Sequence, residues 1–123
     1  MTANNSNDDN PTTIEFIGDY ILKIWLDENN LYNRRNNKPA VVLETPNGNV
    51  ITKGYYLHGI PKDGVYNFNY RLDGSIRLTM SKNNDGGDTI ICYNKDGSIH
   101  STDIVDRWCQ PVDVFNNAML YFK

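Results

Sequence analysis

The side chains best suited to acid–base or metal chemistry are few in this sequence and far apart. His58 and His100 are its two histidines, and Cys92 and Cys109 its two cysteines. A zinc site made from both cysteines and His100 would be one ligand short of the usual four, and its cysteines are not closely spaced. Cys92 lies in an apolar run, where burial raises the pKa of a thiol and makes it less reactive. We therefore expect structural or exposed histidines and two reduced thiols.

The acidic residues offer no clearer site. The loop Asn83–Asp88 is rich in possible calcium ligands, but Cys92 stands where the EF-hand pattern needs a closing glutamate. Turn chemistry explains the same residues. The spacing of Asp103, Asp106 and Asp113 does not require a catalytic pair. Nucleotide-binding, nucleophile-elbow and zinc-protease motifs are missing. The sequence therefore predicts a protein that is not an enzyme and has no metal or cofactor.

The aromatic residues are the strongest candidates for a binding surface. In the middle of the chain Tyr66, Phe68 and Tyr70 alternate, and alternation in a strand would place all three on one face. One interpretation is a core or half-buried sheet face, and the other is an interaction surface for a protein or a glycan. The residues assigned to this surface are Trp25, Tyr55, Tyr56, Tyr66, Phe68 and Tyr70.

Composition argues against several classes of function. The chain has 123 residues and a net charge of −3, and its densest basic stretch is Arg34, Arg35 and Lys38. Nucleic-acid binding normally needs a larger basic patch, because affinity comes from neutralising phosphates. Neither a signal peptide nor an apolar run of about 20 residues is seen, so we expect no membrane span and an intracellular location. Asparagine is unusually frequent, with 18 residues, as an AT-rich genome would produce.

The elements that position these residues are predicted to be strands. Residues 1–12 are polar and are expected to form a disordered tail, and residues 13–123 a single domain. Residues 14–26 fit either strands or a helix. Their β-branched and aromatic content and the internal Gly18 favour strands, with Tyr20 to Leu26 as an edge strand. Pro39 then opens an apolar strand that ends at the hairpin signal Asn47-Gly48.

A hairpin repeat follows in the second half of the chain. Tyr70–Ile76 (YRLDGSI) is matched by Tyr93–Ile99 (YNKDGSI), with Asp-Gly at the same place in each copy. This pattern predicts two-residue hairpin turns with Gly74 and Gly97 at positive φ. Beyond Pro111, the spacing of Val112, Phe115, Met119 and Phe122 predicts a short helix. The predicted fold is all-β or β-rich, an antiparallel meander of three to four hairpins with a short C-terminal helix.

Residues 25 to 60 also resemble a known pattern, the short hairpin repeat common in giant DNA viruses, which is similar in layout to MORN-type and antitoxin-like repeats. That repeat runs W-Y-x-N-G-x-x-H-R-x-x-x-P-A-V, and Asn30 and Asn33 depart from it at the turn glycine and the histidine. The resemblance implies a β-meander, a location in the host cytoplasm or the virion, and no shared reaction. The residues that carry it are Trp25, Asn30-Leu31-Tyr32, Arg34, Pro39–Val42, Asn47-Gly48, Tyr55-Tyr56 and Gly59-Ile60.

These observations together predict a non-enzymatic structural or protein-interaction protein, such as a giant-virus virion or virus-factory component. The alternative is a ligand-binding module that holds a glycan or small molecule on an aromatic sheet face. The expected partner is another protein or a second copy of the chain. A homodimer is expected because a meander leaves two edge strands, and Trp25 is expected near its interface.

Overall fold

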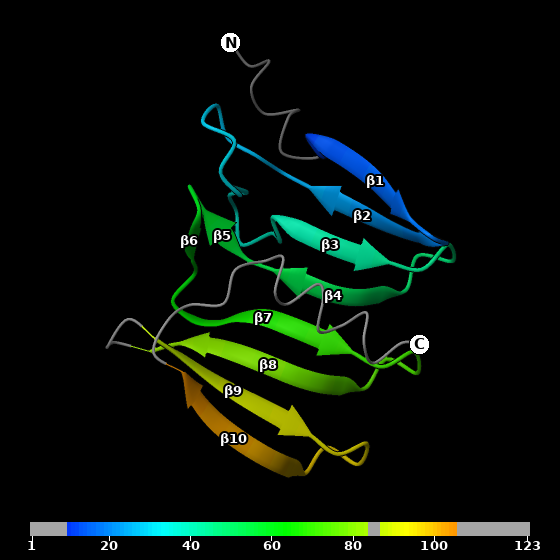
Figure 1. Cartoon of the computed structure of the whole chain (residues 1–123), viewed down its shortest axis with the longest axis vertical. Coiled ribbons are helices and arrows are strands. Elements are labelled where there is room, and N and C mark those ends of the chain that lie inside the picture. Colours follow the sequence, from blue (N-terminus) through cyan, green and yellow to red (C-terminus); the bar gives the residue numbers. More distant parts are fainter. Residues whose placement is uncertain (1–9, 84–86, 106–123) are drawn as a thin grey trace.

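The structure is a computed structural model that describes residues 10–83 and 87–105, and every regular element in this part of the chain is a β-strand (Figure 1). The predicted all-β antiparallel meander is confirmed. None of the described elements is a helix that could cross a membrane. The strands are β1 (Thr13–Ile17), β2 (Tyr20–Ile24), β3 (Val41–Glu44), β4 (Val50–Gly54), β5 (Tyr56–Leu57), β6 (Ile60–Pro61), β7 (Gly64–Tyr70), β8 (Ile76–Lys82), β9 (Asp88–Tyr93) and β10 (Ile99–Val105).

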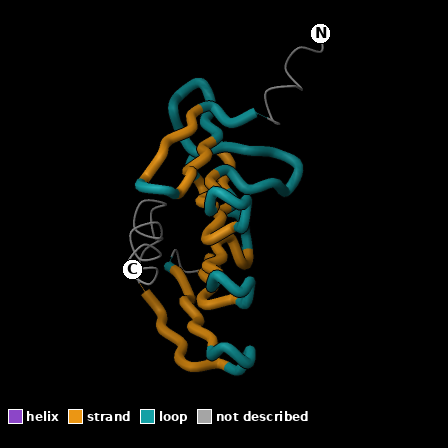
Figure 2. Tube along the Cα trace, turned by 90° about the vertical axis from the view of Figure 1, so that its right-hand side faces the viewer, coloured by secondary structure: helices purple, strands orange, loops and turns teal. Residues whose placement is uncertain are grey.

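Eight of these strands form one sheet in the order β1-β2-β3-β4-β7-β8-β9-β10, and β5 pairs with β6 in a separate small hairpin. All neighbours are antiparallel. Seen edge-on, the strands stack in a single layer (Figure 2). Because the β5–β6 hairpin leaves the sheet, β4 and β7 become neighbours although nine residues separate them in the sequence.

The structure corrects two expectations about the elements. In the described residues, seven pairs of strands that are consecutive in the sequence are joined as antiparallel neighbours, rather than three to four hairpins. The outer strand at the N-terminal side is β1, and β2 is paired on both sides. The expected strand Tyr20 to Leu26 is therefore not an edge. The predicted C-terminal helix lies outside the described residues, as do residues 1–9 of the expected tail. Thr12, the last residue of that tail, is attached to the fold, because its Oγ1 accepts a hydrogen bond from the Leu26 N–H at 2.8 Å.

The repeated turns are longer than the sequence suggested. Gly74 and Gly97 have the predicted positive φ, at 91° and 93°. Each closes a three-residue loop, because the Gly74 N–H bonds to the Arg71 carbonyl and the Arg71 N–H bonds to the Ser75 carbonyl. The preceding aspartates keep negative φ, so these are type I turns followed by a left-handed glycine, not two-residue type I′ turns. The turn at Gly48 has the same hydrogen bonds.

The buried core lies on one face of the sheet. On β2, β3 and β8 it takes alternate residues, as expected for a sheet with one buried face. Two β-bulges each add one more residue to the core. In β4 the extra residue is Ile51, which has no partner between Leu43 and Glu44 of β3. In β7 it is Tyr66, which has no partner between Met80 and Ser81 of β8. Both of these side chains are almost fully buried. The core cluster consists of Leu22, Ile24, Ala40, Val41, Leu43, Ile51, Tyr56, Tyr66, Leu78 and Met80.

Candidate functional site

The opposite face of the sheet carries a group of aromatic rings around one lysine. Lys53 on β4 is paired with Phe68 on β7, and Tyr70 lies two residues farther along β7. All of these side chains are half-buried, as is Tyr55 directly after β4. Phe68 and Tyr70 stack with ring centroids 6.3 Å apart, and Tyr55 meets Phe68 edge-on at 6.2 Å. We call Lys53, Tyr55, Phe68 and Tyr70 the lysine–aromatic surface.

The Lys53 ammonium is held mainly by these rings. Its Nζ lies 5.3 Å from the centroid of Phe68, 5.7 Å from Tyr70 and 5.8 Å from Tyr55. Each distance is within the range of a cation–π contact. Partial burial alone would lower the pKa of Lys53, but its interactions with the hydroxyls of Tyr70 and Tyr55 outweigh this effect, so the pKa is raised. The surface therefore carries a fixed positive charge at neutral pH.

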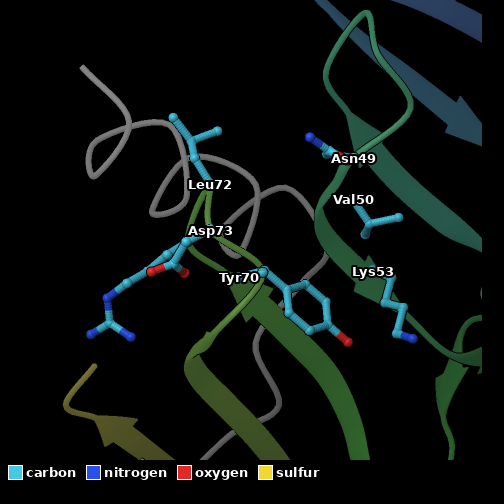
Figure 3. Close-up of a pocket in the computed structure, with 8 residues that line it drawn as sticks. Asn49, Val50, Lys53, Tyr70, Leu72 and Asp73 are labelled. Carbon is cyan, nitrogen blue, oxygen red and sulfur yellow. The ribbon is translucent and has the colours of Figure 1, made fainter. Parts of the chain in front are cut away.

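A hollow of about 380 Å³ adjoins one end of this surface. In Figure 3 the Tyr70 ring lies beside the Lys53 side chain, and Asn49 and Asp73 come from two different hairpin turns. The hydrogen bonds from Ser75 lower the pKa of Asp73 to about 2. This hollow is therefore mixed in charge. It is lined by Asn49, Val50, Lys53 and residues 70–74.

Tyr55 also lines a second hollow, of about 220 Å³. Among the described residues, four cationic side chains and no carboxylate line it, and we call it the cationic hollow. Lys62 lies 4.6 Å from the centroid of the Tyr55 ring, and its Nζ donates to Asn37 Oδ1 at 2.8 Å. The lining residues are Arg34, Arg35, Asn36, Asn37, Lys38, Tyr55, Tyr56, Leu57 and Lys62.

Arg34 is held in a fixed position at the edge of the cationic hollow. Its guanidinium lies 3.8 Å from the centroid of the Trp25 ring and donates to the Pro39 carbonyl at 3.2 Å. Its backbone N–H also bonds to the Tyr56 carbonyl. Stacking of this kind suits the planar guanidinium and limits its movement. The wall formed by Arg34 is therefore organised before any ligand arrives.

Only part of the aromatic surface expected from the sequence lies on this face. Tyr55, Phe68 and Tyr70 are brought together, as described above. Tyr56 and Tyr66 belong to the core, with their rings 5.7 Å apart. Trp25 is 6% exposed and its ring lies against the Arg34 guanidinium. Its expected position near a dimer interface stays a prediction.

The bulge at Tyr66 explains why the alternation rule failed there. The register shifts between Val65 and Asn67, which turns Tyr66 to the core while Phe68 and Tyr70 stay on the opposite face. Sequence reasoning also missed Lys53 and Lys62. Lys53 stands two residues before Tyr55 in a strand, a spacing that puts both on one side and was available as a signal.

The histidines were expected to be structural or exposed, and the structure shows that one of them, His58, contacts an aspartate. His58 Nδ1 lies 2.6 Å from Asp27 Oδ2 beside a cavity of about 700 Å³. The Asp27 carboxylate also accepts hydrogen bonds from the backbone N–H groups of Asn29 and Leu31. The bond to His58 is the main cause that lowers the pKa of Asp27, and the backbone bond from Leu31 adds to it. The pair joins the β5–β6 turn to the loop after β2.

The other residues considered for chemistry are dispersed. Among the described residues no three histidine, cysteine or acidic side chains are grouped to hold a metal ion. Cys92 is half-buried in β9, and His100 and Asp103 are exposed on β10. Asp88, at the end of the loop first considered for calcium, is buried and accepts a hydrogen bond from the Tyr66 hydroxyl at 2.6 Å. Cys109, Asp106 and Asp113 lie outside the described residues.

Comparisons with known proteins give no relative from which to infer a function. No family model, no curated protein and no solved structure matches this chain.

Proposed function

We propose that this chain is a non-enzymatic interaction protein that binds a protein partner through its lysine–aromatic surface. The observation that supports the proposal is three half-buried rings gathered around the Lys53 ammonium on the sheet face opposite the core. Aromatic rings supply much of the energy at protein interfaces, because they bury a large area with little loss of side-chain freedom. A role as a virion or virus-factory component rests on the resemblance to giant-virus repeats alone.

The test is affinity purification from the native infected or host cell, followed by binding measurements with the partner that is recovered. Phe68→Ala and Tyr70→Ala should weaken binding about tenfold or more, as truncation of an aromatic anchor does. Ile104→Ala is the control, since Ile104 is exposed on β10, far along the sheet from β7. Circular dichroism must show that all variants are folded. Equal binding by the three variants would place the interface elsewhere and reject the proposal.

The hollow beside Tyr70 supports a second candidate, a module that binds a glycan or other small molecule. Its volume of about 380 Å³ lies in the range of ligand sites, and Tyr70 offers a ring for stacking. Screening of glycans and metabolites by thermal shift tests it. A true ligand should raise the melting temperature of the chain without any partner, and Tyr70→Ala should abolish the rise. A rise that persists in Tyr70→Ala would show a site other than this hollow.

Self-association through the outer strand β1 remains part of the proposal. Ile14 and Phe16 are 52% and 74% exposed. Ile17 and Tyr20 flank a two-residue loop, so their backbone groups hydrogen-bond to each other. Because hydrogen-bonded and non-hydrogen-bonded pairs alternate along an antiparallel ladder, the backbone N–H and C=O groups of Ile14 and Phe16 point away from β2. A two-fold axis at Phe16 would pair two copies while keeping their Glu15 carboxylates apart.

Light scattering on a size-exclusion column measures this association. The dimer should have twice the 14.1 kDa mass of the chain, and Phe16→Lys should return it to a monomer. Ile104→Lys, on the outer strand β10, is the matched control. A wild-type monomer at tens of micromolar would exclude the homodimer.

A further inference from the structure

We infer that the cationic hollow receives carboxylate side chains from an acidic, leucine-containing segment of the protein partner. The inference rests on the proposed function and specifies the chemistry of the partner. Lys62 lines the cationic hollow and Lys53 lines the first hollow. Their ammonium groups lie 4.6 and 5.8 Å from the centroid of the Tyr55 ring, so an extended segment lying over this ring would be within reach of both.

The two lysines have neutral partners in the described part of the chain. Lys62 contacts the Tyr55 ring and the Asn37 amide oxygen. Lys53 contacts the rings of Tyr55, Phe68 and Tyr70 and interacts with the hydroxyls of the two tyrosines. Neutral partners orient an ammonium group without cancelling its charge. An arriving carboxylate therefore gains a charge-assisted hydrogen bond without having to displace another carboxylate.

The carboxylates that lie close to Lys62 in the sequence and to Lys53 on the sheet, Asp63 and Glu44, form ion pairs with other lysines. Asp63 follows Lys62 directly, yet its Oδ1 lies 2.9 Å from Lys82 Nζ. That ion pair, chiefly through its hydrogen bond, lowers the pKa of Asp63. Glu44, on the same sheet face, lies 2.8 Å from Lys23 Nζ. The chain as a whole has a net charge of −3, whereas the described residues that line the cationic hollow include four cations and no carboxylate. A partner is directed to it by charge complementarity.

The surroundings of the hollow favour a peptide over a nucleic acid. Leu57 lines the hollow and is 48% exposed, and Ile60, its pairing partner in the hairpin, is 52% exposed. These apolar side chains match a leucine in the partner but offer nothing to a sugar–phosphate backbone. The positive surface also ends at Asp73 in the first hollow, whereas a nucleic acid strand needs a continuous basic track.

Fluorescence anisotropy with the full chain tests the inference. The probes are a labelled dodecapeptide of Asp and Glu with two Leu, its Asn/Gln counterpart, and a labelled thymidylate dodecamer. The acidic peptide should bind tightest, and added salt should weaken it. Lys62→Gln and Lys53→Gln should each raise its Kd by roughly tenfold, the loss expected for one charge-assisted bond. His100→Gln, at an exposed position on the outer strand β10, should leave the Kd unchanged.

Two results would overturn the inference. One is tighter binding of the thymidylate dodecamer or of the Asn/Gln peptide, and the other is an unchanged Kd for the acidic peptide in both lysine variants. Either result leaves the proposed function intact if the partner from the cell still loses binding to Phe68→Ala. Conversely, a partner that ignores Phe68→Ala while the acidic peptide still needs Lys62 would reject the proposed function and keep the anion site.

Discussion

Replacing Gly54 by alanine should destabilise the fold although the backbone there is ordinary. Gly54 lies at the end of β4, paired with Val41 on one side and Asn67 on the other. It is not among the glycines with positive φ, so an alanine meets no backbone strain. A Cβ at this position would instead lie 2.9 Å from Tyr56 Cε1, 3.0 Å from Asn67 Nδ2 and 3.1 Å from Val41 Cγ1.

The size of the effect follows from two opposing terms. Alanine is favoured over glycine in a strand by about 0.5–1 kcal/mol, because the unfolded chain loses less entropy. Overpacking of a core costs about 1–3 kcal/mol. All three neighbours are buried in the sheet, so none can move aside freely. We therefore expect a net loss of about 1–2 kcal/mol in the free energy of unfolding.

Urea unfolding followed by circular dichroism measures this loss, with Val41→Ala and the double variant completing a cycle. Removal of the Val41 methyl groups takes away one of the three clashes, so the double variant should be less destabilised than the sum of the two single ones. An unchanged or higher urea midpoint for Gly54→Ala, at unchanged slope, would refute the packing argument. Full additivity in the cycle would show that Val41 does not limit the space.

Three further perturbations test other parts of the structure. Gly74→Val should cost about 1–2 kcal/mol or more in urea unfolding through its φ of 91° alone, because a Cβ there meets nothing within 4 Å; a cost near zero would contradict the left-handed assignment. Ser75→Ala should raise the pKa of Asp73 from about 2 toward its ordinary value, as an NMR titration would show, and an unmoved pKa would mean that Ser75 is not the cause. Asp27 has a lowered pKa, so its contribution to stability is complete above its ordinary pKa and is lost as the pH falls below that value; Asp27→Asn should flatten this acid dependence in urea unfolding, and an unchanged dependence would exclude Asp27 as its source.

The hairpins could be predicted because their signals are local. Asn47-Gly48, Asp73-Gly74 and Asp96-Gly97 each supply a residue that tolerates a turn next to one that accepts positive φ. The loop length was missed because Asp-Gly suits both two-residue and three-residue turns. In the two Asp-Gly turns, the residue after the glycine indicates the loop length. Ser75 and Ser98 each donate their backbone N–H and hydroxyl to the preceding aspartate, which favours the longer turn.

The lysine–aromatic surface could be predicted only in part, because long-range pairing decides it. Phe68 and Tyr70 were recognised as aromatic strand residues, but their closeness to Lys53 depends on β4 pairing with β7. That pairing exists because residues 55–63 leave the sheet as a separate hairpin. The side of Tyr66 depends on a bulge whose register is fixed by β8. Neither the separate hairpin nor the bulge changes the alternation of apolar and polar residues in a way that the sequence reveals.

The asparagine content has a structural reason that composition alone did not reveal. Four residues other than glycine have positive φ in the described part of the chain, and three of them are asparagines: Asn30, Asn36 and Asn37. Asparagine tolerates this region better than other side chains because its amide can bond to nearby backbone.

Other asparagines act through their side chains. Asn33 accepts the His58 N–H, and Asn37 accepts from Lys62 at the cationic hollow. Asn67 and Asn69 are buried in β7, where β-propensity disfavours asparagine. Codon usage alone would not select these placements. Replacing the loop asparagines as a group would therefore remove the turns that hold Lys62 and His58, and not merely alter the composition of the surface.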